Sequence, residues 1–332
     1  MLDMHTRPIA LADHPLTQHK YIIATPSINA LIQKVKRLIR MHTPGGMIYA
    51  HPRFGKTYSI RYIIRVLKQD YPGAICLTFG AEAKKTSSED SFFTCLLEAA
   101  GHQGALTGSV TRKRRRLIER VTELVDGSGL NWVVLFADEA QRLEVMEYEW
   151  LRDVHDCLER KGIRMITLLV GQPQLLNQKT AFRYSQHTQI ILRFMVAEMR
   201  FDGLTTPEQL AACLQGYDLA VYPANTDWTY TRFFYPQAYA NGMRLVEQTA
   251  VLWRAFLDAH NAVVPGVKIE IPMQHFAHTI ENAFEENVKL DCPDFRFTPA
   301  MWERAIQESY FQVAQEELYR DTPAEKPESR KH

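Results

Sequence analysis

The segment Ala50–Thr57, AHPRFGKT, has the spacing of a Walker A phosphate loop, with alanine in place of the first glycine. Such a loop surrounds phosphates with backbone N–H groups at the start of a helix. Gly55 would let the backbone approach closely, Lys56 would reach the β- and γ-phosphates, and the Thr57 hydroxyl would bind Mg²⁺. The pattern predicts an ATP site. The alternative is an ordinary strand–turn–helix junction with an exposed lysine.

An acidic pair, Asp138-Glu139, ends the apolar run that begins at Trp132. Asp138 would hold Mg²⁺, directly or through water, and Glu139 would polarise the attacking water, which a hydrolase needs and a simple nucleotide binder does not. An acidic pair after a strand can instead cap the N-terminus of a helix. The expected nucleotide-binding residues are Ala50, His51, Pro52, Arg53, Phe54, Gly55, Lys56, Thr57, Tyr58 and Asp138, with Thr57 and Asp138 as metal ligands.

Other polar residues stand where they could act on the γ-phosphate. Gln172 follows the strand-like run 163–170 and could orient the water, although it could equally be a turn residue. Arg183 or Arg193 could reach the phosphate of a neighbouring subunit as an arginine finger, unless each is an ordinary surface arginine. Arg244 could reach back across the nucleotide from a lid. The expected catalytic residues are therefore Glu139, Gln172, Arg183 and Arg244.

Strand-like and helical patterns alternate along the first two hundred residues, as they do in a parallel sheet. Helical spacing of apolar residues begins near Ile28 and again after the phosphate loop. The predicted strands are 47–50, 74–79, 132–139, 163–170 and 189–194. The predicted fold class is α/β, a P-loop parallel sheet sandwiched by helices and followed by a smaller helical lid and C-terminal domain.

The domain boundaries follow from where these patterns change. Residues 1–20 are expected to form an arm with little structure, and 21–204 the α/β domain. Residues 205–320 form the helical lid and C-terminal region, and the Pro- and charge-rich tail 321–332 is expected to be disordered. The aromatic stretch 217–239 could be lid core or a docking surface, and core is favoured because aromatic side chains bury large areas.

Composition limits the class of protein. A length of 332 residues suggests two domains, and 46% hydrophobic with 23% charged residues excludes a disordered, collagenous or coiled-coil chain. The cysteines, 5 in number, form no CxxC pair, so they indicate reduced thiols instead of disulfides or a zinc site. The sequence shows no long apolar span and no signal-peptide pattern, so a cytoplasmic protein is expected.

Taken together, these motifs resemble the AAA+ branch of the P-loop ATPases, and within it the transposon regulators TnsC and TniB and their relative IstB. Each motif is weak to moderate alone, but their order and spacing are specific, and the resemblance covers residues 20–260. Ala50 and the long aromatic stretch depart from the family pattern. The matching segments are YIIATP at 21–26, DEAQRL at 138–143, VGQPQLL at 170–176, FRYSQHTQIILRF at 182–194 and GMRLVEQTA at 242–250.

The resemblance implies an ATP- and Mg²⁺-dependent ATPase that assembles into rings or helical filaments on double-stranded DNA. Such a homo-oligomer bridges a target-selector protein of the TniQ or TnsD kind to the transposase. The transposon that it serves could be a CRISPR-associated one. ATP would lie at subunit interfaces, with Arg183 supplied by the neighbour. The resemblance also implies that Arg244 is the lid arginine called sensor 2, and that 21–26 covers the adenine.

One dense basic run, 112–116, stands out in a chain whose formal net charge is only +1. Cations at a helix N-terminus oppose the helix dipole, so a local reason for them is expected, and phosphate binding is one. In the resembling family this position faces DNA, which makes Thr111, Arg112 and Lys113 the expected DNA contacts. A solvated cationic face is the alternative.

Two other function classes remain open. A small-molecule P-loop kinase usually has arginines in its lid and no glutamate after the metal-binding aspartate, so Asp138-Glu139 and the trailing helical domain disfavour it. A nucleotide-gated scaffold that does not hydrolyse ATP would carry the same motifs, and only a measurement of turnover separates it from an ATPase.

Overall fold

The computed structural model describes residues 6–320, and contacts divide these residues into two compact units. The sheet unit comprises Ala30–Pro52 and Lys56–Phe201. The helical unit comprises the N-terminal segment up to Asn29, the short stretch Arg53–Gly55, and the chain from Asp202 onward. The predicted tail 321–332 lies outside the described residues.

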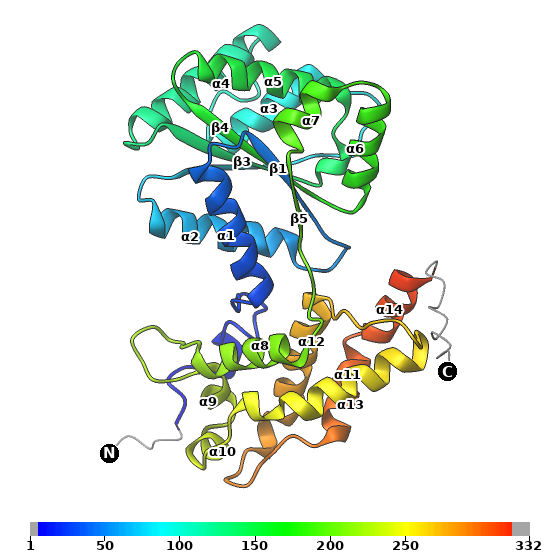
Figure 1. The fold of residues 1–332 in the computed structure, drawn as a ribbon. Helices are drawn as coiled ribbons and strands as arrows, with labels where there is room; N and C mark the ends of the chain where they lie inside the picture. The colour runs from blue at the N-terminus through cyan, green and yellow to red at the C-terminus, as the bar shows by residue number, and fades with distance from the viewer. Residues whose placement is uncertain (1–5, 321–332) are drawn as a thin grey trace, which may run out of the picture. The chain divides into compact units, whose positions relative to one another are not determined.

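The sheet unit is built on five parallel strands in the order β2-β3-β4-β1-β5 (Figure 1). Four of them match the predicted strands: β1 (Gly45–Tyr49), β2 (Ile75–Gly80), β3 (Trp132–Asp138) and β4 (Arg164–Gly171). β3 and β4 are buried almost along their whole length, which is why they read as continuous apolar runs. The predicted α/β class is confirmed.

Helices cover both faces of this sheet (Figure 1). Val133, Leu135 and Ala137 of β3 belong to one core cluster with α3 (Glu89–Ala99), α4 (Val110–Asp126), α5 (Val145–Glu159) and α7 (Thr188–Phe194). Successive side chains of a strand point to opposite faces, so the alternate residues Val134 and Phe136 face the other layer. That layer is α1 (Pro26–Arg40) and α2 (Lys56–Asp70).

The predicted strand at 189–194 is wrong. These residues belong to helix α7, and the edge strand is the short β5, Ala197–Arg200, which pairs with β1. Ile190 and Phe194 are buried while the residues between them are more exposed, a spacing of four that fits one face of a helix. A short apolar run does not by itself distinguish the two structures, because it contains too few polar positions to show a period of 2 or of 3.6.

The sheet unit also contains α6 (Gln174–Tyr184), and the helical unit contains the remaining helices, one of which contributes many residues to its core. That helix is α12, Met273–Asn287, which carries a buried face including Phe276, Ile280 and Phe284. The last two helices are separated at Tyr310, whose φ is +58°. The other helices are α8 (Pro207–Leu219), α9 (Tyr230–Phe234), α10 (Pro236–Ala240), α11 (Thr249–Val263), α13 (Pro299–Glu308) and α14 (Phe311–Tyr319).

The aromatic stretch 217–239 supplies much of the core of the helical unit, as favoured from the sequence. Tyr217, Phe233, Phe234 and Tyr235 are each at most 1% exposed and pack in one cluster with α12 and α13. The aromatic stretch is therefore part of the hydrophobic core and not an exposed docking surface.

The N-terminal segment is not the loose arm that the sequence suggested. Leu16 and His14 are fully buried within the helical unit, and the Arg7 guanidinium donates to the carbonyls of Phe233 and Phe234 at 2.7 and 3.0 Å. Its partners lie more than 200 residues away in sequence, so local pattern could not reveal them. The helical unit therefore includes residues from both the first and the last part of the described chain.

No helix within residues 6–320 is long and apolar enough to span a membrane. The cysteines are unpaired, as expected from their spacing.

Candidate functional site

The phosphate loop lies between the end of β1 and the first residue of α2 (Figure 1). Two of its residues, Arg53 and Gly55, have positive φ angles of +68° and +86°, so the chain curls back on itself before the helix starts. Glycine adopts such a conformation without strain, which accounts for Gly55. Phe54 between them is buried, at 1% exposure. The loop therefore has the strand–loop–helix context that phosphate binding requires.

Lys56 is held across the loop that it follows. Its ammonium donates to the carbonyl oxygens of Ala50 and His51, both at 3.1 Å, and the residue is only 8% exposed. Burial lowers the pKa of Lys56, while the nearby carboxylates of Glu139 and Asp138 act in the opposite direction. The ammonium is thus already positioned at the loop, bonded to carbonyl oxygens that phosphate oxygens could replace.

The surroundings of the loop favour negative charge. Burial lowers the pKa of His51, and the positive charges of Arg200 and Lys56 lower it further. Arg200 and Lys56 therefore contribute positive potential beside the loop, in addition to the larger effect of burial on the pKa of His51. A triphosphate would experience the same potential as an attraction.

Thr57 and Asp138 meet at the edge where the strands end. The Thr57 hydroxyl donates to Asp138 Oδ2 at 3.0 Å, and Asp138 Oδ1 accepts the N–H of Glu139 at 2.9 Å. A hydroxyl and a carboxylate are the oxygen donors that Mg²⁺ prefers, so the pair fits the predicted metal site. No group of three or more His, Cys, Asp or Glu side chains that could hold a metal occurs in the described part of the chain. The remaining ligands would have to be phosphate oxygens and water.

Glu139 does not cap a helix, which was the alternative interpretation of the acidic pair. Glu139 precedes a short 3₁₀ turn, Ala140–Arg142, and its side chain makes no capping hydrogen bond to that turn. The φ angle of Glu139 itself is +53°. Instead Glu139 Oε2 accepts a hydrogen bond from the Gln141 amide at 2.7 Å. A non-glycine residue in the left-handed region is uncommon and often marks a functional position.

Gln141 is a site residue that the sequence analysis missed. Besides holding Glu139, its Oε1 accepts the N–H of Gln172 at 3.1 Å, so it joins the ends of β3 and β4. Gly171 makes this possible, because a Cβ at that position would lie 2.3 Å from Gln141 Oε1. The clue in the sequence was an amide two residues after Glu139. Its meaning depends on which strands are neighbours.

Gln172 is also placed beside the phosphate loop. The N–H of Ala50, the first loop residue, donates to the carbonyl of Gly171 at 3.1 Å, and the Gln172 side chain is half-buried. One edge of the sheet therefore gathers Lys56, Thr57, Asp138, Glu139 and Gln172.

The predicted arginines lie in different surroundings. Arg183 is exposed in the last turn of α6, Gln174–Tyr184, whereas Arg193 of α7 forms an ion pair with Asp156. Arg244 belongs to the helical unit and precedes a short 3₁₀ turn, Leu245–Gln248, which leads directly into α11. Its guanidinium donates to the carbonyls of Tyr239 and Met243 at 3.0 and 2.7 Å and stacks on the Tyr239 ring.

The basic run forms the start of α4, and most of its charged side chains already bind other groups of the same chain. Lys113 is 3% exposed, and its ammonium bonds to Asp90 and to the Thr94 hydroxyl, both at 2.8 Å. The expectation that Lys113 contacts DNA therefore needs correction, because its side chain is buried and neutralised. Thr111 and Arg112 are exposed. The partners of the other three are Glu89 and Asp153 for Arg114, Glu119 for Arg115, and the Gly104 and Thr107 carbonyls for Arg116.

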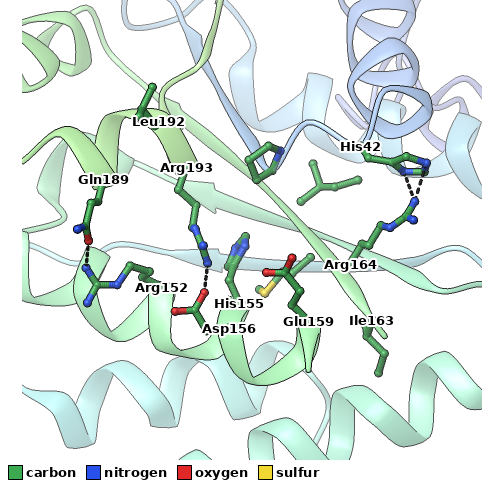
Figure 2. Close-up of a pocket in the computed structure, with 13 residues that line it drawn as sticks. His42, Arg152, His155, Asp156, Glu159, Ile163, Arg164, Gln189, Leu192 and Arg193 are labelled. Atoms are coloured by element: carbon green, nitrogen blue, oxygen red, sulfur yellow. Dashed lines mark hydrogen bonds and ion pairs between the residues drawn. The ribbon is translucent and has the colours of Figure 1, made fainter. Parts of the chain in front are cut away.

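Figure 2 shows a separate pocket of about 850 Å³ in the sheet unit. Its walls come from α5, α7 and the starts of β1 and β4, with His42 and Arg164 on one side and Arg193 with Asp156 on the other. The strands begin at this pocket, whereas the phosphate loop follows the end of β1. The pocket is therefore not part of the nucleotide site.

A parallel sheet with a phosphate loop after β1 and an acidic pair at the end of the strand two places away is the arrangement of a P-loop domain. Residues 39–178 match the family model described as AAA domain, a range that includes the phosphate loop, the acidic pair and Gln172. This part of the chain is therefore similar to an AAA domain. A comparison with curated protein sequences gives no match.

The comparison with solved structures finds several proteins that are similar to this chain at low sequence identity. The Aeropyrum pernix ORC1 protein in complex with DNA has a TM-score of 0.54 and 14% identity, over 93% of this chain and 72% of that one. Drosophila ORC bound to DNA has a TM-score of 0.49 and 11% sequence identity, over 97% of this chain and 73% of that one. Cdc6p from Pyrobaculum aerophilum has a TM-score of 0.45 and 13% sequence identity, over 93% of this chain and 89% of that one. At this identity, the first of these supports a shared fold.

Proposed function

We propose that this chain is an AAA+ ATPase that oligomerises on double-stranded DNA and regulates transposition, where it bridges a target-selector protein and a transposase. The observation that carries the nucleotide part is the Thr57–Asp138 contact of 3.0 Å beside Lys56 and Glu139. A cytoplasmic, DNA-associated location follows from this proposal. The transposition role rests on the resemblance of the motifs at 138–143, 170–176 and 242–250 to TnsC and TniB.

Each residue of the nucleotide site has a distinct task in this proposal. The loop backbone and Lys56 bind the phosphates, and Thr57 with Asp138 would hold Mg²⁺, which neutralises charge that develops on the phosphates. Glu139 accepts a proton from the attacking water, and Gln172 orients that water. Gln141 fixes the direction of the Glu139 carboxylate through its 2.7 Å hydrogen bond. The expected turnover is slow, since the nucleotide sets assembly instead of driving movement.

Arg183 is the arginine that we assign to a neighbouring copy. It is exposed at the end of a helix, next to Tyr184, which is 85% exposed. Arg193 would first have to leave Asp156. We propose that Arg244 senses the γ-phosphate from the lid. For this, its guanidinium would have to exchange its hydrogen bonds to the carbonyls of Tyr239 and Met243 for a contact with the phosphate.

The test of the proposed function is assembly, because ATP-dependent stacking on a duplex distinguishes this class from a small-molecule kinase. Electron microscopy of the wild-type chain with duplex DNA is expected to show rings or filaments with ATP and dispersed particles without it. A monomer under every condition would contradict the proposal. A phosphorylated small molecule formed without assembly would point to the kinase.

For the DNA contact, we expect Arg112→Gln to weaken binding to duplexes of any sequence and to reduce the slope of log affinity against log salt by about 1. Arg112 is exposed, and in the described residues no carboxylate pairs with it. Fluorescence anisotropy across a salt series measures the slope. Lys161→Gln, an exposed lysine elsewhere in the sheet unit, is the control. An unchanged slope for Arg112→Gln would remove this residue from the interface.

A further inference from the structure

The small net charge of this protein hides a strong asymmetry. From His14 to Gln69 the sequence has no Asp or Glu and 10 Lys or Arg, which leaves 29 Lys or Arg against 38 Asp or Glu in the rest of the chain. The basic residues are spread at helical intervals, so no dense run draws attention to them. They are Lys20, Lys34, Lys36, Arg37, Arg40, Arg53, Lys56, Arg61, Arg65 and Lys68.

Two neighbouring helices carry most of these charges. α1 and α2 lie on the same face of the sheet (Figure 1), and Lys36 of α1 forms an ion pair with Asp70 at the end of α2. Their apolar sides are buried, as Val35 and Leu67 illustrate at 1% and 0% exposure. Their other sides are exposed and present a set of cations that we call the α1–α2 basic face: Lys34, Arg37, Arg40, Arg61, Arg65 and Lys68.

The charges of the α1–α2 basic face are uncompensated. Among residues 6–320, none of the six cations forms an ion pair with a carboxylate, in contrast to α4, where Lys113, Arg114 and Arg115 are each paired. Within α2, Arg61 and Arg65 are four residues apart, and like charges at that spacing destabilise a helix by a few tenths of a kcal/mol. Such an arrangement is unfavourable in the free chain and is relieved by a polyanion.

The helix dipole explains only part of this pattern. Cations in the last turn of a helix are favourable, which accounts for Arg37, Arg40 and Lys68. It does not account for Lys34 in the middle of α1 or Arg61 in the second turn of α2. Those positions need another reason.

We propose that the α1–α2 basic face binds the phosphate backbone of double-stranded DNA, as a second contact besides the start of α4. Arg61, Arg65 and Lys68 form one row along α2 that spans about 10 Å at about 1.5 Å per residue, a length that covers roughly three phosphates of one strand. The contact is independent of base sequence, because it uses long flexible cations and no side chain that could read a base edge.

A duplex fits this face better than an anionic membrane does. A helix that lies on a membrane inserts an apolar side into the lipid. In α1 and α2 the apolar sides are occupied by the sheet, and only the charged sides remain. The inference rests on the DNA-binding part of the proposed function but assigns it to a different surface.

The test is the triple substitution Arg37→Gln, Arg61→Gln and Arg65→Gln, assayed by anisotropy with a mixed-sequence duplex and ATP over a salt series. We expect the log–log salt slope to fall by about 3 and the affinity to fall more than tenfold. The matching Arg→Lys triple keeps the charges and is expected to keep the slope, which separates a phosphate contact from a packing defect. The control variant of equal charge change replaces Arg254, Lys289 and Arg304 of the helical unit with Gln.

The outcomes separate this inference from the proposed function. If the wild-type chain and Arg112→Gln differ in salt slope while the Gln triple matches wild type, the α1–α2 contact is overturned and DNA binding stands. A wild-type chain that binds ATP but no duplex overturns both. Capture on phosphatidylserine vesicles that the Gln triple abolishes, with no change in the DNA slope, would assign this face to membranes and overturn the contact with DNA.

Discussion

Lys56→Ala is expected to abolish ATP-dependent assembly and to weaken nucleotide binding by about 10- to 150-fold, the equivalent of about 1.5–3 kcal/mol for a charge-assisted hydrogen bond. The substitution removes the one ammonium that the loop carbonyls of Ala50 and His51 hold in place. Alanine is a good helix former, so α2 is expected to remain intact. Binding of a fluorescent ATP analogue and sedimentation with and without ATP measure the two effects.

The control for this variant is Lys161→Ala, which removes an exposed lysine outside the nucleotide site. Circular dichroism confirms that both variants are folded. Nucleotide uptake and self-association that match those of wild type in Lys56→Ala would show that the loop is an ordinary strand–turn–helix junction.

Glu139→Gln is expected to lower ATP turnover by about 10²- to 10⁴-fold, the usual contribution of a positioned general base, while nucleotide binding stays close to wild type. Glutamine has nearly the same shape and still bonds to Gln141, but it cannot accept a proton from water. Steady-state phosphate release measures the loss, and Glu159→Gln, an exposed glutamate on α5, is the control.

This pair of measurements also decides between an ATPase and a scaffold. If wild type and Glu139→Gln both show negligible turnover and both assemble with ATP, the chain is a nucleotide-gated scaffold. If both turn over ATP at equal, substantial rates, Glu139 is not the base.

The sheet could be predicted from the sequence because its central strands are buried on both faces. β3 and β4 are therefore long apolar runs, β3 ends in Asp138, and Gln172 follows β4 at the edge where the phosphate loop lies. β5 could not be predicted in the same way. It has four residues, AEMR, and lies at the edge of the sheet, so neither length nor hydrophobicity marks it.

Contacts between distant segments set the limits for the rest. The charge run on α4 gave no sign that Lys113 points inward, because its partner Asp90 lies on another helix, α3. The N-terminal segment looked unstructured because its partners, including Phe233, come more than 200 residues later. Gln141 had no visible role until β3 and β4 were known to be neighbours.

A residue with no side chain also shapes the chemistry at this edge. Gly171 has no Cβ, which leaves room for the Gln141 amide. That amide in turn fixes the direction of the Glu139 carboxylate. A methyl group there would lie 2.3 Å from Gln141 Oε1, so the amide that holds the Glu139 carboxylate would have to move. The side chain that position 171 can accept is thus limited by the neighbouring amide of Gln141.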